Sequence, residues 1–242
     1  MSDLPPSVPS GEETERVRQF FDQWHLYKKV VAFNYLHHRE AYAALAGALD
    51  RFEKPFRFLD LGAGDAAWTS QVLQGRPLRR YEAVDLSPVA LDLARKNFAR
   101  TDCEALFTVG DFCDALRSGS EVEDVIFIGL SFHHLPLADK RVMLPVIRKR
   151  LAEHGSFLCY EPIHAENESR AQVLERWWQD VLRDWTELTP EELSAVQDHV
   201  FNNDYPESCE TYARIAREAG FAETRVLYRD PHSFYAVIEC RA

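Results

Sequence analysis

The sequence predicts an α/β fold: a doubly wound, mostly parallel sheet of seven strands that ends in an antiparallel hairpin. The first observation is that, after Pro55, short apolar runs alternate with helical patterns of about ten to fifteen residues. Connections of that length can cross over a sheet and return parallel, so helices are expected on both faces. The second observation is that the last two apolar runs are joined by a short turn at Pro231, which predicts an antiparallel pair.

The expected strands are short, apolar runs bounded by turn residues. They are residues 56–62, 80–87, 105–112, 124–132, 155–162, 223–230 and 233–241. Apolar residues at helical spacing predict the helices of the core, at 66–74, 87–100, 138–151 and 209–220. Ser87 is the expected N-cap of the second helix, with Pro88 at its first position, and Gly220 ends the last one.

Further helical regions are expected outside this core. Residues 12–54 carry apolar residues at helical spacing before any strand, and they predict an N-terminal helical cap. Residues 1–11 are rich in Pro and Ser and are expected to form a disordered tail. The main domain is expected at 55–242, with a helical insertion at 163–203 after the fifth strand.

Composition and charge narrow the class of protein. The net charge of −11 disfavours nucleic acid as a partner, because an acidic surface repels phosphates. No apolar run approaches the ~18 residues of a membrane span, and no secretory signal is visible, so no membrane association is expected. The five cysteines are scattered and never spaced as CxxC, which predicts reduced thiols and a cytoplasmic location.

The stretch "LDLGAGDA" predicts a nucleotide-like cofactor beside the first strand. Gly62 and Gly64 permit a tight turn and close backbone approach, and the helix that follows offers free N–H groups. Asp85 ends the second strand, where a carboxylate can accept both hydroxyls of a ribose. This pattern alone also satisfies the dinucleotide fingerprint, so an NAD(P)-dependent oxidoreductase is one alternative.

Three details favour a different cofactor. Asp60, directly before the turn, would repel a pyrophosphate but would attract an ammonium group. Asp111 follows the third strand, where it can meet an adenine amino group, with Phe112 beside the ring. Moreover, no Tyr is followed four residues later by Lys, the proton-donor pair of short-chain dehydrogenases.

The ordered motifs resemble those of the class I S-adenosylmethionine-dependent methyltransferases. The matching stretches are "LDLGAGDA", "YEAVDLS", "VGDF", "DVIFIGLSFHHLP" and "GSFLCYEP", between about residues 56 and 162. The resemblance implies S-adenosylmethionine as the cofactor and a methyl-transfer reaction. It also implies where the cofactor binds: Asp60, Gly62 and Gly64 at the methionine part, Asp85 at the ribose, Asp111 and Phe112 at the adenine, and Leu130 with Ser131 beside the sulfonium. Leu86 is a further candidate for cofactor binding. Ala66 replaces the third glycine of the pattern, a change that a helix tolerates.

Three side chains near the ends of the fourth and fifth strands are candidates for the catalytic base or for contact with the methyl acceptor. They are His133, His134 and Glu161. Because neighbouring side chains point apart, at most one of the two histidines is expected to face the site, and the other is expected to hold the loop. No metal ion is expected, since His37, His38 and these two histidines have no ligand spacing.

The methyl acceptor is expected to be a small molecule, selected by the N-terminal helices and by the insertion. The candidate contacts are Tyr27, Tyr35, His38, Arg39 and Trp178. The aromatic residues equally suit packing of the helices onto the sheet. Trp178 and Trp185 are seven positions apart, which predicts one helix face. A protein that binds the cofactor without turnover remains a second alternative to the enzyme, and neither the acceptor nor the oligomeric state is predicted.

Overall fold

The computed structural model describes residues 25–242 and divides the chain into two units, 1–38 and 39–242. The expected tail at 1–11 and the start of the expected cap at 12–24 lie outside the described residues. In the first unit, residues 25–32 are helical and the phenol of Tyr27 lies 3.1 Å from Nε2 of His38. Burial lowers the pKa of His38 to about 4, so this imidazole is neutral near pH 7.

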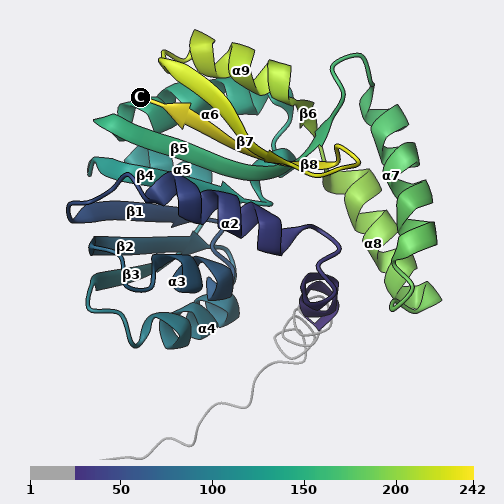
Figure 1. Cartoon of the computed structure of the whole chain (residues 1–242), viewed down its shortest axis with the longest axis horizontal. Helices are drawn as coiled ribbons and strands as arrows, with labels where there is room; N and C mark the ends of the chain where they lie inside the picture. The colour runs from purple at the N-terminus through teal and green to yellow at the C-terminus, as the bar shows by residue number, and fades with distance from the viewer. Residues whose placement is uncertain (1–24) are drawn as a thin grey trace, which may run out of the picture. The chain divides into compact units, whose positions relative to one another are not determined.

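The second unit is built on a sheet with the strand order β3-β2-β1-β4-β5-β8-β7 (Figure 1). The strands are β1 (Phe56–Leu61), β2 (Leu78–Asp85), β3 (Glu104–Val109), β4 (Glu123–Gly129), β5 (Leu151–His164), β7 (Glu223–Arg229) and β8 (Tyr235–Arg241). The first five pair in parallel, whereas β8 pairs antiparallel with both β5 and β7. The predicted doubly wound sheet with a terminal hairpin is confirmed.

One strand was missed by the sequence prediction. The two residues of β6 (Glu207–Ser208) pair in parallel with Ile163 and His164, so the sheet gains an eighth strand beside its seven-stranded path. The seven predicted strands form the path of the sheet, and β6 was not predicted, because a two-residue pairing leaves no periodic signal in the sequence.

The helices alternate with the strands as the crossovers require. They are α2 (His38–Leu49), α3 (Ala67–Leu73), α4 (Pro88–Phe98), α5 (Phe112–Ser118), α6 (Leu137–Lys149), α7 (Arg170–Asp184), α8 (Pro190–Asn203) and α9 (Cys209–Glu218), with a 3₁₀ turn, η1 (Phe132–His134). The expected N-cap is observed, since Oγ of Ser87 accepts the Ala90 N–H at 3.2 Å. Capping boxes at Ser169 and Thr189 start the two helices of the insertion.

Each face of the sheet is covered by its own set of helices (Figure 1). Leu59 and Leu61 of β1 belong to a buried apolar cluster that includes residues of α5, α6 and α9. Alternate residues point to the other face, where Tyr81 stacks on Phe98 of α4 with ring centroids 3.7 Å apart. Tyr42 of α2 lies edge-on to Phe127 on the same face. This alternation leaves the strand ends as the place where loops from both layers meet.

Among residues 25–242, no helix combines the length and the apolar character that crossing a bilayer requires.

Candidate active site

The turn after β1 has the backbone conformation that its glycines predict. Gly62 and Gly64 have φ values of 68° and 55°, in the left-handed region. A side chain at Gly62 would place its Cβ 2.8 Å from the Cβ of Ser131, and closer still to its hydroxyl, so this turn lies directly against the loop after β4. Around Gly64, in contrast, no heavy atom of residues 25–242, apart from Gly64 and its two chain neighbours, lies within 4 Å of such a Cβ.

Ala66 departs from the prediction. It lies at the N-cap of α3 with φ 50° and ψ 24°, before the helix begins, and is not the helical residue that the sequence pattern suggested. The left-handed conformation costs an L-residue roughly 1–2 kcal/mol, which a glycine would avoid. The sequence analysis explained this alanine by the tolerance of a helix, and that explanation is wrong. Ala66 lies before the helix, at a position of the turn that favours glycine.

Asp85 fixes the glycine turn from the tip of β2. Its Oδ2 accepts the N–H of Gly64 at 2.8 Å, and its Oδ1 accepts the N–H of Ser87 at 2.8 Å. The neighbouring Leu86 is 71% exposed, which leaves an apolar side chain standing beside the carboxylate at this edge of the sheet. Asp85, predicted at the ribose, and Leu86, a further candidate for cofactor binding, therefore lie together next to the turn.

Asp60 lies inside the fold rather than on the surface of the turn. It is buried, and the Tyr81 hydroxyl donates to its Oδ2 at 2.9 Å. Burial raises the pKa of Asp60 to about 7, although hydrogen bonds from Tyr81 and Thr69 oppose the shift. Its predicted contact with an ammonium group stays a prediction.

Asp111 acts as a helix cap. One oxygen, Oδ1, accepts the N–H groups of Cys113 and Asp114 at 2.8 and 3.2 Å and starts α5. Phe112 is partly buried and packs against the apolar cluster. Neither observation tests a contact with adenine. Leu130, after β4, has φ 51° and donates its N–H to the Tyr160 carbonyl at 2.7 Å, so it is held at the same strand edge.

Glu161 anchors the loop that contains both candidate histidines. Its side chain has no exposed surface, and its Oε1 accepts the N–H groups of Ser131 and Phe132 at 3.3 and 3.0 Å. Its Oε2 accepts the N–H of His133 at 2.9 Å and lies 2.6 Å from Nδ1 of the same residue. A carboxylate with all these partners orients the 3₁₀ turn, and its predicted role as a base or an amine contact is not tested.

The sequence analysis expected the side chains of the two histidines to point apart, but in the structure they do not. Their ring centroids are 4.1 Å apart, and both rings approach Asp204, which follows α8. The adjacent residues lie in a 3₁₀ turn rather than in a strand, so the alternation of a strand does not apply. His133 is buried, whereas the side chain of His134 is 39% exposed.

Asp204 sets the electrostatics of this pair and was missed by the sequence analysis. Burial lowers the pKa of His134, but the nearby Asp204 carboxylate outweighs this effect, so the pKa is raised overall. No pattern in the sequence marks Asp204, because it is distant from the histidines along the chain and reaches the site through the insertion.

The predicted acceptor contacts lie in different places. Tyr27, Tyr35 and His38 belong to the first unit, 1–38. Trp178, on α7, lies edge-on to Phe201 of α8, with ring centroids 6.5 Å apart. Its expected partner, Trp185, follows the last residue of α7 and lies edge-on to Trp177 at 5.6 Å. The single helix face expected for Trp178 and Trp185 is therefore incorrect, because the helix ends before Trp185.

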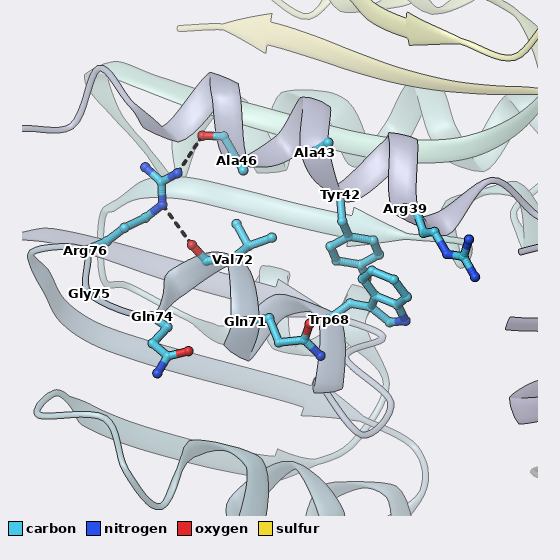
Figure 2. Close-up of a pocket in the computed structure, with 10 residues that line it drawn as sticks. All are labelled: Arg39, Tyr42, Ala43, Ala46, Trp68, Gln71, Val72, Gln74, Gly75 and Arg76. Carbon is cyan, nitrogen blue, oxygen red and sulfur yellow. Dashed lines mark hydrogen bonds between the residues drawn. The ribbon is translucent and has the colours of Figure 1, made fainter. Parts of the chain in front are cut away.

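Arg39 lines a groove of about 530 Å³ between α2 and α3 (Figure 2). Tyr42 and Trp68 stack at 5.6 Å near Arg39, and Arg76 spans the far end by donating to the carbonyls of Ala46 and Val72 (Figure 2). Sequence reasoning missed this groove, because the aromatic pair unites a helix of the expected cap with the helix after the glycine turn.

Comparison with known proteins identifies the central part of the chain. Residues 58–155 match a family model described as a methyltransferase domain. Among curated proteins, the release factor glutamine methyltransferase of Deinococcus radiodurans is 34% identical over 100 residues, which are 41% of this chain and 34% of that protein. The protein of the same name from Koribacter versatilis is 31% identical over 74 residues, 31% of this chain and 26% of that protein. The chain thus spans about a third or less of these relatives.

Solved structures show the same fold at low identity. A putative methyltransferase in complex with the Trm112 methyltransferase activator of Haloferax volcanii has a TM-score of 0.64 at 21% identity, over 93% of this chain and 97% of that one. A putative O-methyltransferase from Nostoc punctiforme gives 0.62 at 16%, over 90% and 60% of the two chains. Human N-acetylserotonin methyltransferase, solved with S-adenosylmethionine, gives 0.60 at 16%, over 97% and 60%.

The strand order, the glycine turn and the matched domain together define a Rossmann-like, class I methyltransferase fold. The family model covers residues 58–155, which is less than half of the chain, and the solved structures show that the chain shares the fold of known methyltransferases.

The cofactor that these matches support is S-adenosylmethionine, as the sequence predicted. The residues present fit such a group: Gly64 leaves open space at the turn, Asp85 offers a carboxylate beside it, and Leu86 exposes an apolar side chain at the same strand tip.

Proposed function

We propose that this chain is an S-adenosylmethionine-dependent methyltransferase that acts on a small molecule. The proposal rests on the hydrogen bond from the Gly64 N–H to the Asp85 carboxylate, which connects the glycine turn to the tip of β2 at the carboxyl edge of the parallel strands. In doubly wound sheets, ligands bind at this edge, where the strand order reverses beside β1. The bound cofactor would supply a methyl group made electrophilic by a sulfonium.

The chain's own contribution is to bind and to align. Gly62 and Gly64 bring backbone close to the methionine part, and Asp85 accepts from ribose hydroxyls with the lone pairs that Gly64 and Ser87 leave open. Glu161 fixes the loop after β4, so that Leu130 and the histidines keep one position beside the reacting methyl. Fixing nucleophile and methyl in line is the main source of acceleration for such a transfer.

The acceptor is selected by parts of the chain outside the matched domain. The segment 58–155 contains the glycine turn and the loop after β4, whereas α7 and α8 follow it. We infer a small acceptor held beside the loop after β4 by these helices. The names of the two curated relatives favour a second candidate, the glutamine side chain of a release factor, and this alternative requires a protein acceptor.

A binding experiment tests the cofactor assignment. Isothermal titration of S-adenosylmethionine and of S-adenosylhomocysteine should give micromolar binding to the full chain, and NADH should not bind. Asp85→Asn should weaken binding by about 1–3 kcal/mol, which is roughly 5- to 150-fold, because a charged acceptor is lost. Asp92→Asn, at an exposed position of α4 where the carboxylate pairs with Arg95, is the matched control and should bind as the wild type does. Equal affinities for both variants would remove Asp85 from the site.

A labelling experiment tests the acceptor. Cell extract is incubated with the enzyme and methyl-labelled S-adenosylmethionine, then separated into small molecules and protein. The proposal expects label in a small molecule, identified by mass spectrometry. Label in a glutamine of a protein would refute the small-molecule acceptor and establish the alternative. No transfer, with cofactor bound, would refute the enzyme and favour a binding protein without turnover.

A further inference from the structure

Three side chains that can ligate a metal ion converge beside η1. They are His133 and His134 of that turn and Asp204 at the end of α8, and one ligand atom from each lies within 4.8 Å of the other two. Oδ1 of Asp204 is 3.5 Å from Nε2 of His133 and 3.4 Å from Nδ1 of His134. Two imidazole nitrogens and one carboxylate oxygen are ligands that divalent transition metals accept.

The Asp204 oxygen that points into this cluster lacks a hydrogen bond. Oδ1 is fully buried and has no hydrogen-bond partner among the described residues, and the whole residue is 6% exposed. A buried carboxylate oxygen without a partner costs several kcal/mol unless a cation compensates it. This orphaned atom is a second observation, independent of the spacing of the ligands, that points to a bound cation.

The hydrogen bonding of His133 prepares its other nitrogen for a metal. Nδ1 lies 2.6 Å from the buried carboxylate of Glu161, which can only accept, so Nδ1 carries a proton. In the neutral ring, Nε2 then presents a lone pair toward Oδ1 of Asp204, and two acceptors face each other. A carboxylate that holds the far nitrogen of a histidine is the usual support of a metal ligand, because it fixes the tautomer and the ring orientation.

The alternative to a metal ion is a proton on Nδ1 of His134. Nδ1 of His134 also lies 3.3 Å from the carbonyl of Asn203, so a proton on this nitrogen would face that carbonyl and Asp204 together. A single cation among the three ligand atoms would instead contact all of them at once.

We propose that His133 Nε2, His134 Nδ1 and Asp204 Oδ1 form a binding site for a divalent transition-metal ion of the zinc type. Bonds of about 2.0–2.1 Å in a tetrahedral site separate ligand atoms by roughly 3.3 Å, close to the two measured separations from Asp204. The sequence analysis expected no metal ion, because it considered the histidines without Asp204.

The partly exposed ring of His134 leaves one side of this site open. The ring of His199 lies edge-on to the ring of His134, with ring centroids 5.5 Å apart. The same turn begins at Ser131, which contacts the glycine turn, so an ion here would lie on the loop that joins the cofactor side to the insertion. Three protein ligands and an open position suit an ion that binds an oxygen or nitrogen of another molecule. This inference does not depend on the proposed function, since it concerns metal binding alone.

Metal binding to the full chain tests the proposal directly. After treatment with EDTA and removal of the chelator, the chain is titrated with Co²⁺, followed by its visible absorption, and with Zn²⁺ by calorimetry. One ion per chain is expected, with the Co²⁺ spectrum of a four-coordinate site displaced by Zn²⁺. His134→Ala and Asp204→Asn should each weaken binding at least about 100-fold, and Glu161→Gln about 10- to 100-fold through His133.

A second histidine–aspartate pair provides the matched control. Nδ1 of His232 contacts Asp180 at the surface, and Asp180→Asn removes the same chemical group without touching the site. Asp180→Asn should bind Co²⁺ as the wild type does. Thermal unfolding without metal checks that each variant folds; Zn²⁺ should then raise the Tm of the wild type but not of His134→Ala. Absence of stoichiometric binding, or binding unchanged in both His134→Ala and Asp204→Asn, would overturn the proposal and leave a protonated His134 in this space.

Discussion

Replacing Gly62 by alanine should destabilise the fold more than the same change at Gly64. Both positions have positive φ, so each variant pays the left-handed cost of about 1–2 kcal/mol. Only at Gly62 does the new Cβ meet another residue, at 2.8 Å from the Cβ of Ser131, whereas carbon atoms pack best at about 3.5–4.0 Å. Moving the loop by the missing distance should cost a further 1–3 kcal/mol, on the order of other overpacked substitutions.

The comparison isolates this contact. Any gain from a less flexible unfolded chain is common to the two variants and cancels between them. The free energy of unfolding, measured in urea, should therefore be lower for Gly62→Ala than for Gly64→Ala by about 1–3 kcal/mol. Adding Ser131→Gly to the Gly62→Ala variant should recover the loss of unfolding free energy that comes from the steric contact. The loss that comes from the left-handed backbone should remain. Equal losses at the two glycines would refute the contact between the turn and the loop.

Two further changes probe buried ionisable groups. The pKa of Asp60 is about 7 in the folded chain, against its usual 3.8, so the folded state binds the proton more tightly and stability falls as pH rises between about 4 and 7. Asp60→Asn should flatten this slope and stabilise the chain at pH 8 relative to wild type, measured by urea unfolding across pH; an unchanged slope would exclude Asp60 as its source. Lys140 is fully buried and donates to the Tyr205 carbonyl, with Glu207 3.6 Å away. Lys140→Met should lower the free energy of unfolding by roughly 2–4 kcal/mol, because it strands that acceptor and carboxylate; a neutral result would show that they find other partners.

The sequence predicted those parts of the fold that have local signals. Apolar runs between glycines and prolines marked the strands, and Ser87 marked the start of α4. Ala66 was misinterpreted because nothing in an alanine announces a left-handed backbone, which the surrounding turn imposes. β6 was missed because its two residues pair only once β5 is in place.

The candidate site was predictable on the cofactor side and not on the other. Asp85 and the glycines follow directly after strands, so their common edge follows from parallel pairing alone. Asp204 reaches the histidines only through the packing of the insertion, which brings together residues far apart in the chain. The adjacent histidines were assigned to opposite sides because the 3₁₀ turn that holds them depends on Glu161, a residue from another strand.

The end of β5 is the physical link between the two sides of the site. Opposite β4, its pairing ends at Tyr160, yet the strand continues to His164. In this extension Glu161 binds the N–H groups of the 3₁₀ turn, and Ile163 and His164 pair with β6, which begins three residues after Asp204. One extended segment thus sets the position of the histidines and of the carboxylate that faces them. Because both depend on the same backbone, a change that frees the last residues of β5 should loosen the histidine turn and Asp204 together, rather than either one alone.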